Sequence, residues 1–162
     1  MEGTILQVNV SDGGLPKRPV SGAYLAELGV EGDRQAHPQI HGGPEKAVLL
    51  IAAEAVDALK ERGYPVFYGA LGENLTTRGL ALRDLRIGDR LWAGKALIQI
   101  TRPRGPCAQL DVYGASLQRE IWDPLMQRRD PASPRWGLSG LYARVVAPGP
   151  VVAGDIIAVE LA

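Results

Sequence analysis

The sequence has few of the residues that build metal centres and disulfides. Its 162 residues include one cysteine, Cys107, and two histidines, His37 and His41. A single cysteine cannot form an internal disulfide, and with two histidines it cannot complete a Cys-based structural zinc site or ligate its own iron–sulfur cluster. Any redox chemistry must therefore use a bound cofactor or a partner protein.

The sequence also lacks an excess of charge of either sign. Its 18 lysines and arginines are balanced by 18 aspartates and glutamates. A protein that binds nucleic acid normally carries a basic excess or a basic stripe, whereas the arginines here are scattered among acids. We therefore expect no nucleic-acid partner.

Long hydrophobic runs are missing as well. A membrane-spanning helix needs about 20 consecutive apolar residues, and no run approaches that length. The stretch Met1-Glu2-Gly3 begins without the basic and apolar regions of a signal peptide. We expect a cytoplasmic protein without a membrane partner, and one domain over residues 1–162, because no repeat, linker or low-complexity run divides the chain.

What the sequence does contain is short runs rich in Val, Ile and Leu, punctuated by Gly and Pro. This pattern is typical of many short strands and predicts a mainly β fold, a barrel or a sandwich. A strand is expected over residues 3–10. Residues 89–101 predict a hairpin with its turn at 93–95, and residues 141–161 repeat the scheme with Pro148-Gly149-Pro150 as the interruption.

Two stretches have helical patterns. Residues 52–63 predict a helix that ends at Gly63, and residues 116–129 predict one that Pro124 kinks or divides. The apolar run 47–53 fits either a strand or the start of a helix. A few short helices are therefore expected beside the strands.

Three polar clusters are candidates for a site. Residues 32–48 crowd basic side chains and histidines around Gly42-Gly43-Pro44, which suits either a ligand loop or an ordinary turn. Residues 71–80 combine Glu, Asn and Thr between glycines, a composition that by itself favours a stabilised turn. In residues 101–110, Cys107 is either a small buried hydrophobe or a thiolate favoured by neighbouring arginines, and a thiolate acts as a nucleophile or a soft-metal ligand.

Several motifs, in order along the chain, resemble the MOSC domain family, named for the molybdenum cofactor sulfurase C-terminus. They are "GDRQAHPQIHGGPEKAV", "GENLTTRGL", "RIGDRLWAGKALIQITRPRGPC", "GLYARVV" and "VVAGD". The resemblance runs from about residue 15 to residue 155 and covers most of the chain. It implies a MOSC-type β-barrel of the stand-alone bacterial kind that binds the pterin-type molybdenum cofactor, molybdopterin.

The resemblance also implies roles for individual residues. Cys107 matches the family's cysteine, which either ligates molybdenum or carries sulfur as a persulfide. The positions matching cofactor-binding residues supply cations for phosphate and pterin oxygens, or amide, hydroxyl and imidazole groups for the pterin edge; they are Lys17, Arg34, His41, Lys46, Asn74, Thr76 and Arg104.

Three functions stay open on this basis. The first is reduction of a small N-hydroxylated substrate with electrons from a separate electron donor, Cys107 being the molybdenum ligand and catalytic residue. The second is a sulfur carrier that receives persulfide sulfur on Cys107 from a separate cysteine desulfurase. The third is a non-catalytic module that binds or delivers the cofactor. Pyridoxal phosphate is not expected within this chain.

Overall fold

The structure is a computed structural model and describes residues 1–34 and 42–161. Within these residues the strands are β1 (Glu2–Val10), β2 (Arg18–Val20), β3 (Gly22–Ala26), β4 (Gly29–Val30), β5 (Val48–Ala52), β6 (Leu75–Arg78), β7 (Arg90–Ala93), β8 (Ala96–Pro103), β9 (Leu141–Ala147), β10 (Gly149–Val152) and β11 (Ile156–Val159). The helices are α2 (Ala53–Glu61), α3 (Leu117–Ile121) and α4 (Pro124–Gln127), with 3-10 helices η1 (Pro44–Lys46), η2 (Leu82–Asp84) and η3 (Ala108–Tyr113). The predicted mainly β class with a few short helices is confirmed.

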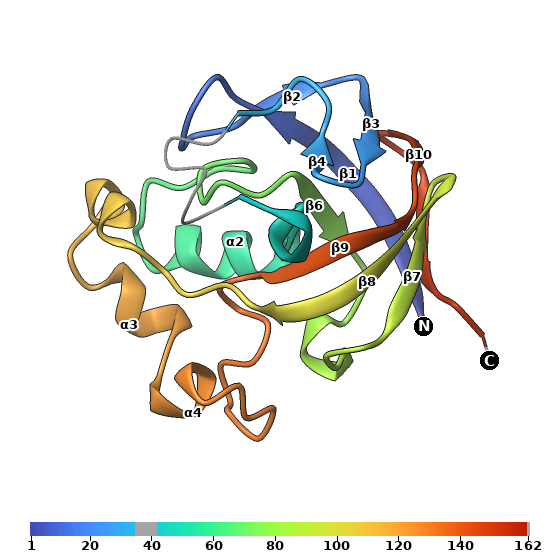
Figure 1. The fold of residues 1–162 in the computed structure, drawn as a ribbon. Helices are drawn as coiled ribbons and strands as arrows, with labels where there is room; N and C mark the ends of the chain where they lie inside the picture. The colour runs from blue at the N-terminus through green and yellow to red at the C-terminus, as the bar shows by residue number, and fades with distance from the viewer. Residues whose placement is uncertain (35–41, 162) are drawn as a thin grey trace.

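Seven strands close into a β-barrel, in the order β1, β11, β7, β8, β9, β5 and β6 (Figure 1). Strand β1 closes the barrel because it pairs with β6 along one edge and, through its first residues, with β11 along the other. Its first residues pair with β11, with Thr4 opposite Ile156, and its last residues pair with β2, with Val8 opposite Val20. The barrel, one of the two architectures expected from the strand pattern, is the one observed.

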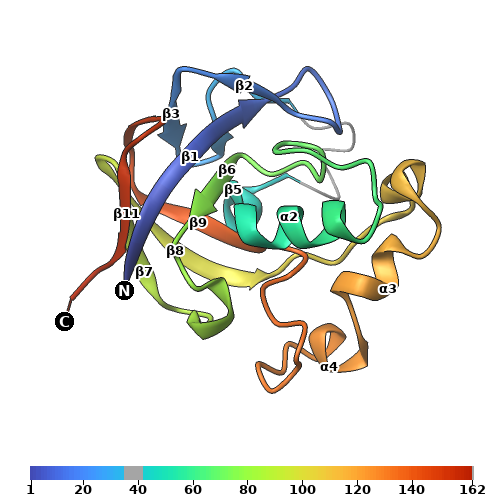
Figure 2. The same ribbon diagram turned by 180° about the vertical axis from the view of Figure 1, so that it is seen from behind.

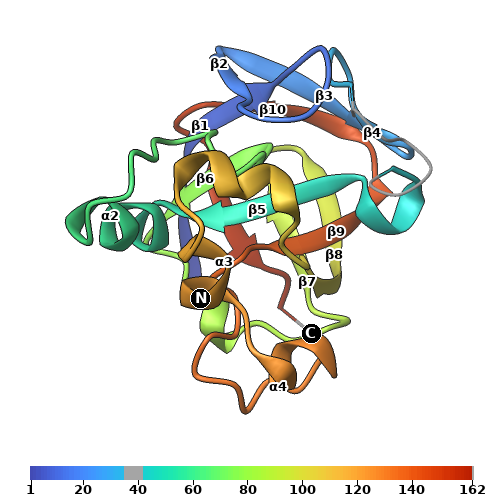
Figure 3. The ribbon, with the colours of Figure 1, turned by 90° about the vertical axis from the view of Figure 1, so that its left-hand side faces the viewer.

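The two predicted hairpins have different outcomes. Strands β7 and β8 form the expected antiparallel hairpin, with Ala93 opposite Ala96 across the turn. Strands β9 and β10 do not pair with each other, so the second hairpin prediction was wrong: β10 pairs with β3 in a separate sheet of order β10, β3, β4. Pro150 has no N–H group to donate to a ladder, which suits it to this edge strand. Figure 3 shows the small sheet lying over the barrel on the side away from α4.

The apolar run at residues 47–53 contains both a strand and the start of a helix. Strand β5 ends at Ala52 and helix α2 begins at Ala53. The strand is buried on both faces: Leu50 points into the barrel, whereas Leu49 and Ile51 belong to a second apolar cluster outside it. Since neighbouring side chains on a strand face opposite ways, a continuous apolar run marks a strand covered on both sides.

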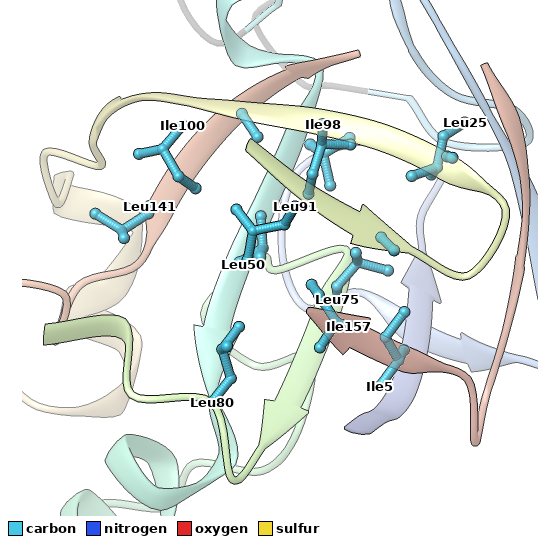
Figure 4. Packing of buried hydrophobic residues seen from close by; sticks show 14 of the residues in the cluster. Ile5, Leu25, Leu50, Leu75, Leu80, Leu91, Ile98, Ile100, Leu141 and Ile157 are labelled. Carbon is cyan, nitrogen blue, oxygen red and sulfur yellow. The ribbon is translucent and has the colours of Figure 1, made fainter. Parts of the chain in front are cut away.

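The barrel interior holds the main hydrophobic core, shown in Figure 4, to which each of the seven barrel strands contributes. The second cluster lies between the outer face of β5 and the helices α2, η3 and α3.

Pro124 divides the predicted helix 116–129 as expected: α4 begins at Pro124, and the Asp123 carboxylate accepts the Met126 N–H at 2.8 Å as its N-cap. Figure 2 shows α3 and α4 at the end of the molecule opposite the β7–β8 turn.

No helix within residues 1–34 and 42–161 is long and apolar enough to cross a membrane.

Candidate functional site

One pocket lies outside the barrel, where the ends of several strands meet. It has about 570 Å³ of empty space, part of it open to solvent. The pocket is lined by apolar side chains, small residues and polar groups: Gly14, Leu15, Lys17, Lys46, Leu49, Leu71, Gly72, Asn74, Arg104, Gly105, Cys107, Gln109 and Tyr142.

Five residues that the sequence nominated from distant positions lie in this lining: Lys17, Lys46, Asn74, Arg104 and Cys107. The fold brings them together because each stands at the end of a structural element. Lys17 precedes β2, Lys46 ends η1, Asn74 precedes β6, Arg104 follows β8, and Cys107 caps η3. The role of these residues in binding a cofactor stays a prediction.

The charge of Lys17 is balanced inside the protein. Its ammonium lies 2.7 Å from each Asp33 carboxylate oxygen, and both side chains are more than nine-tenths buried. Asp33 also accepts a hydrogen bond from the Asn74 amide at 2.9 Å. The Asn74 side-chain oxygen in turn accepts the Leu49 N–H at 3.0 Å. The Asn74 side chain therefore ties β5 to the loop of Asp33 and builds one wall of the pocket.

Thr76 does not reach the pocket surface. Its side chain is fully buried, and its hydroxyl donates to Glu73 Oε2 and accepts from the Asn9 amide, both at 3.1 Å. Arg34 is exposed and lies outside the lining of this pocket. His41 lies outside the described residues.

The sequence placed Glu73 in a polar cluster but not among the candidate site residues, and its side chain is fully buried below these loops. Its Oε2 accepts the Gly69 N–H at 3.0 Å, while its Oε1 has no hydrogen-bond partner within the described residues. Burial raises the pKa of the Glu73 carboxyl, against the opposing effects of hydrogen bonds from Gly69 and Thr76 and of the Arg104 charge. The nearest signal in the sequence was its place beside Asn74 in a polar cluster.

We expect Glu73→Gln to abolish the fall in unfolding free energy that the buried Glu73 carboxyl causes as the pH rises. A carboxyl whose pKa is higher in the folded than in the unfolded state binds more protons when folded, so the free energy of unfolding falls as the pH rises from about 4.3, the ordinary pKa of Glu, through the raised value. The amide resembles the protonated acid and does not titrate. Urea denaturation of both proteins between pH 4 and 8 measures the difference, which should grow with pH in favour of the variant. Equal destabilisation of the variant at every pH would contradict it.

Arg104 is a buried cation with an unused donor. Its side chain is almost fully buried, and its Nη2 donates to the Leu71 carbonyl. Its Nε has no hydrogen-bond partner within the part of the chain that the structure describes. Burial lowers the pKa of the Arg104 guanidinium, and the neighbouring Tyr142, Cys107 and Glu73 oppose that effect. Since arginine keeps its proton in proteins, the pocket wall carries a fixed positive charge.

Cys107 is half-buried and lines the same pocket, so the reading of its thiol as a fully buried hydrophobe does not hold. It stands at the N-cap of η3 in an extended conformation, and its carbonyl accepts the Leu110 N–H at 3.0 Å. The thiol thus sits on a segment fixed by backbone bonds, within reach of a ligand in the pocket.

Sequence reasoning also missed Tyr142, which lies on β9 and is mostly buried in the pocket wall. The Lys46 ammonium stands 5.7 Å from the centroid of its ring, in cation–π range. Burial raises the pKa of the Tyr142 phenol, an effect opposed by Arg104. In the sequence, Tyr142 reads only as one more residue of an alternating strand.

The pocket depends on a close approach of two backbones at Gly69. A Cβ added there would lie 2.2 Å from the Lys17 carbonyl oxygen, and the φ of Gly69 is +98°. The Gly69 carbonyl also accepts the Lys17 N–H at 2.9 Å. Only glycine fits this contact, which holds the Lys17 segment against the loop that carries Glu73.

We therefore expect Gly69→Ala to destabilise the protein by at least about 1 kcal/mol more than the matched control Gly63→Ala. Both positions share the cost of a positive φ, since Gly63 has a φ of +95°, but nothing lies within 4 Å of a Cβ at Gly63. Chemical denaturation of the two variants isolates the cost of the contact. Equal destabilisation of the two variants would mean that the Lys17 segment moves away from the added methyl group without a cost in free energy.

The comparisons with known proteins agree with this fold. The MOSC domain family model matches residues 37–158. Protein YiiM of Escherichia coli is 35% identical over 133 residues, which make up 80% of this chain and 55% of that protein. YflK of Bacillus subtilis is 35% identical over 144 residues, 87% of this chain and 60% of that one. The chain thus spans little more than half the length of these relatives.

Two further similarities extend the comparison. A Gibberella moniliformis protein named a reductase is 30% identical over 139 residues, which are 83% of this chain and 23% of that protein. The crystal structure of YiiM from Geobacillus stearothermophilus superposes with a TM-score of 0.73 at 26% identity, covering 98% of this chain and 75% of that one. The family match spans most of the barrel and the segment of Cys107, and it confirms the resemblance read from the motifs. The chain belongs to the MOSC domain family.

Proposed function

We propose that this chain binds a molybdenum cofactor in the pocket around Cys107 and reduces N-hydroxylated compounds. The observation that carries the proposal is that the half-buried Cys107 thiol shares one pocket with the buried guanidinium of Arg104. An unpaired buried donor such as Arg104 Nε is costly, and a ligand rich in phosphate or carbonyl oxygens would supply its acceptor. Similarity to a fungal protein named a reductase supports the redox part of the proposal.

The residues present fit such a cofactor. Lys46 and Arg104 offer cations, and the backbone at Gly72 and Gly105 leaves room for close approach of a ligand. The Cys107 thiolate would hold the metal, because soft sulfur suits a metal that the cofactor already binds through sulfur. When bound, the cofactor supplies two-electron oxygen-atom transfer.

The protein itself would bind the cofactor, orient it and shield it from water. Leu49, Leu71 and Tyr142 form an apolar wall that excludes water from one side of the pocket. The ion pair of Lys17 with Asp33 and the bonds of Asn74 fix the opposite loops, so the donors are held in place before a ligand arrives. Electrons would come from a separate electron donor.

The test is metal and pterin analysis of the protein purified from a host that makes the molybdenum cofactor, together with an assay of N-hydroxylated bases. Molybdenum in a one-to-one ratio with reduction of the substrate supports the reductase. A persulfide on Cys107 without tightly bound molybdenum would support the sulfur carrier fed by a cysteine desulfurase. Bound cofactor without turnover would support a binding or delivery module.

A further inference from the structure

Tyr142 is the most deeply buried of the five tyrosines, and its hydroxyl forms no hydrogen bond within the described residues. Its side chain is only 8% exposed. Three other tyrosines are half-buried, and each of their hydroxyls forms a hydrogen bond inside the protein; they are Tyr64, Tyr68 and Tyr113. Since a buried phenol usually has a hydrogen-bond partner, the Tyr142 hydroxyl is a donor that the folded chain leaves unused.

The Tyr142 side chain belongs to the wall of the pocket. Strand β9 carries Tyr142 between Leu49 on β5 and Arg102 on β8, its partners in the two strand pairings. Tyr142 lines the pocket together with Leu49 and Cys107. Its ring extends the apolar wall, whereas its hydroxyl is polar. The pocket that holds the Cys107 thiol therefore contains an uncharged donor set in an apolar wall.

The chemistry of this donor indicates what it would bind. A phenol keeps its proton at neutral pH and can donate a hydrogen bond to an oxygen atom. The cations of the pocket suit anionic oxygens, whereas a single phenol suits an uncharged acceptor such as the oxygen of an N–O group. A site built to bond such an oxygen rejects an analogue that lacks it, because the donor is then left unpaired.

We propose that the Tyr142 hydroxyl binds the oxygen of the substrate's N–O group and so distinguishes the substrate from its reduced product. Reduction removes this oxygen, so the product leaves the hydroxyl unpaired and binds more weakly than the substrate. Release of the product is thereby favoured. That the oxygen belongs to a substrate rests on the proposed function, whereas binding of an N–O oxygen by Tyr142 can be measured without turnover.

The first test uses protein made in a host without cofactor synthesis, titrated at pH 8 with pyridine N-oxide or with benzene and followed by NMR. The two probes have rings of similar shape, and only the first has an N–O oxygen. We expect Tyr142→Phe to weaken binding of the N-oxide about 3- to 10-fold, the value of one neutral hydrogen bond, and to leave binding of benzene unchanged. No binding of the N-oxide by the wild type, unchanged binding by the variant, or an equal loss for both probes would overturn the proposal.

The matched control is Tyr64→Phe, which also removes one phenol hydroxyl. That hydroxyl bonds to the Ser116 hydroxyl at 2.7 Å, and Tyr64 lies outside the lining of the pocket. Binding of the N-oxide by the control should equal that of the wild type, and an equal loss would reject the role of Tyr142. The melting temperature of Tyr142→Phe should shift by about 2 °C or less, because the ring stays and the hydroxyl has no partner to lose. A large loss of stability would instead assign the hydroxyl to the fold.

The second test uses protein that holds its cofactor and reduces an N-hydroxylated base. Tyr142→Phe should raise KM about 3- to 10-fold and change kcat by less than about 2-fold, the result of losing a contact made equally before and during the reaction. Molybdenum content and inhibition by the reduced base should stay the same. A fall in molybdenum content would assign the hydroxyl to the cofactor, and a fall in kcat alone would assign it to the reaction; either would overturn the role in substrate binding. If the loaded protein binds pyridine N-oxide through Tyr142 but reduces no N-hydroxylated compound, the proposed function fails and the binding of an N–O oxygen stands.

Discussion

Replacing Cys107 by serine should abolish reduction of N-hydroxylated compounds while leaving the fold intact. The hydroxyl is a harder ligand than the thiolate and cannot form a persulfide, so both the metal-ligand role and the carrier role are lost. The change in volume is small and the side chain is only half-buried, so we expect a shift of about 2 °C or less in the melting temperature. Turnover and thermal melting of the purified variant measure the two effects.

The variant Cys107→Ala serves as a second probe, because it removes the thiol without introducing a hydroxyl. It should be as inactive as the serine variant. Retained turnover in either one would reject both chemical roles of Cys107. A large loss of stability in both would instead assign Cys107 to packing against η3 (Ala108–Tyr113).

The second large effect is expected at Arg104. Arg104→Ala should lower the affinity for the cofactor about 10- to 150-fold, and the cofactor occupancy with it. This factor corresponds to the loss of a charge-assisted hydrogen bond worth about 1.5–3 kcal/mol. Turnover per bound molybdenum should fall far less, because in the proposed function the guanidinium would anchor the cofactor without taking part in the reaction. Molybdenum content and turnover, measured together at fixed ionic strength, separate the two effects.

The structure adds a stability cost to this variant. Arg104 also donates to the Leu71 carbonyl and lies near the buried Glu73, so Arg104→Ala leaves a carbonyl unpaired and costs about 1–3 kcal/mol in unfolding free energy. Arg104→Lys should restore occupancy only in part, because a point charge does not reproduce the planar fork. Unchanged occupancy with lost turnover would place Arg104 among the substrate contacts. If occupancy and turnover were both unchanged, Arg104 would have no role in the site.

Local patterns in the sequence predicted much of the fold. Short Val- and Ile-rich runs predicted the strands, the turn at residues 93–95 predicted the β7–β8 hairpin, and Pro124 divided a helix as expected. The prediction of a second hairpin failed because strand pairing depends on which strands lie side by side in the folded protein. The chain around Pro148 and Gly149 leaves the barrel, and a Cβ at Gly149 would lie 2.6 Å from the Lys95 carbonyl oxygen, a contact between distant segments that no local pattern contains.

The sequence predicted some residues of the candidate site and not others. The motifs nominated Cys107 and Arg104, and these line one pocket. They also nominated Thr76, whose hydroxyl bonds inside the protein instead of facing the pocket. Tyr142 was missed, because an aromatic residue in an alternating strand gives no sign of which face it lines.

By itself the sequence determined the class of fold, the family and the single thiol around which any chemistry must be arranged. These follow from residue types and spacing, which act over a few positions. Only the tertiary structure decided which cations stay unpaired: Lys17 meets Asp33, whereas Arg102 and Arg104 keep buried donors without a partner in the described chain. Charge pairing depends on distances between segments far apart in the sequence, and those distances exist only once the barrel has closed.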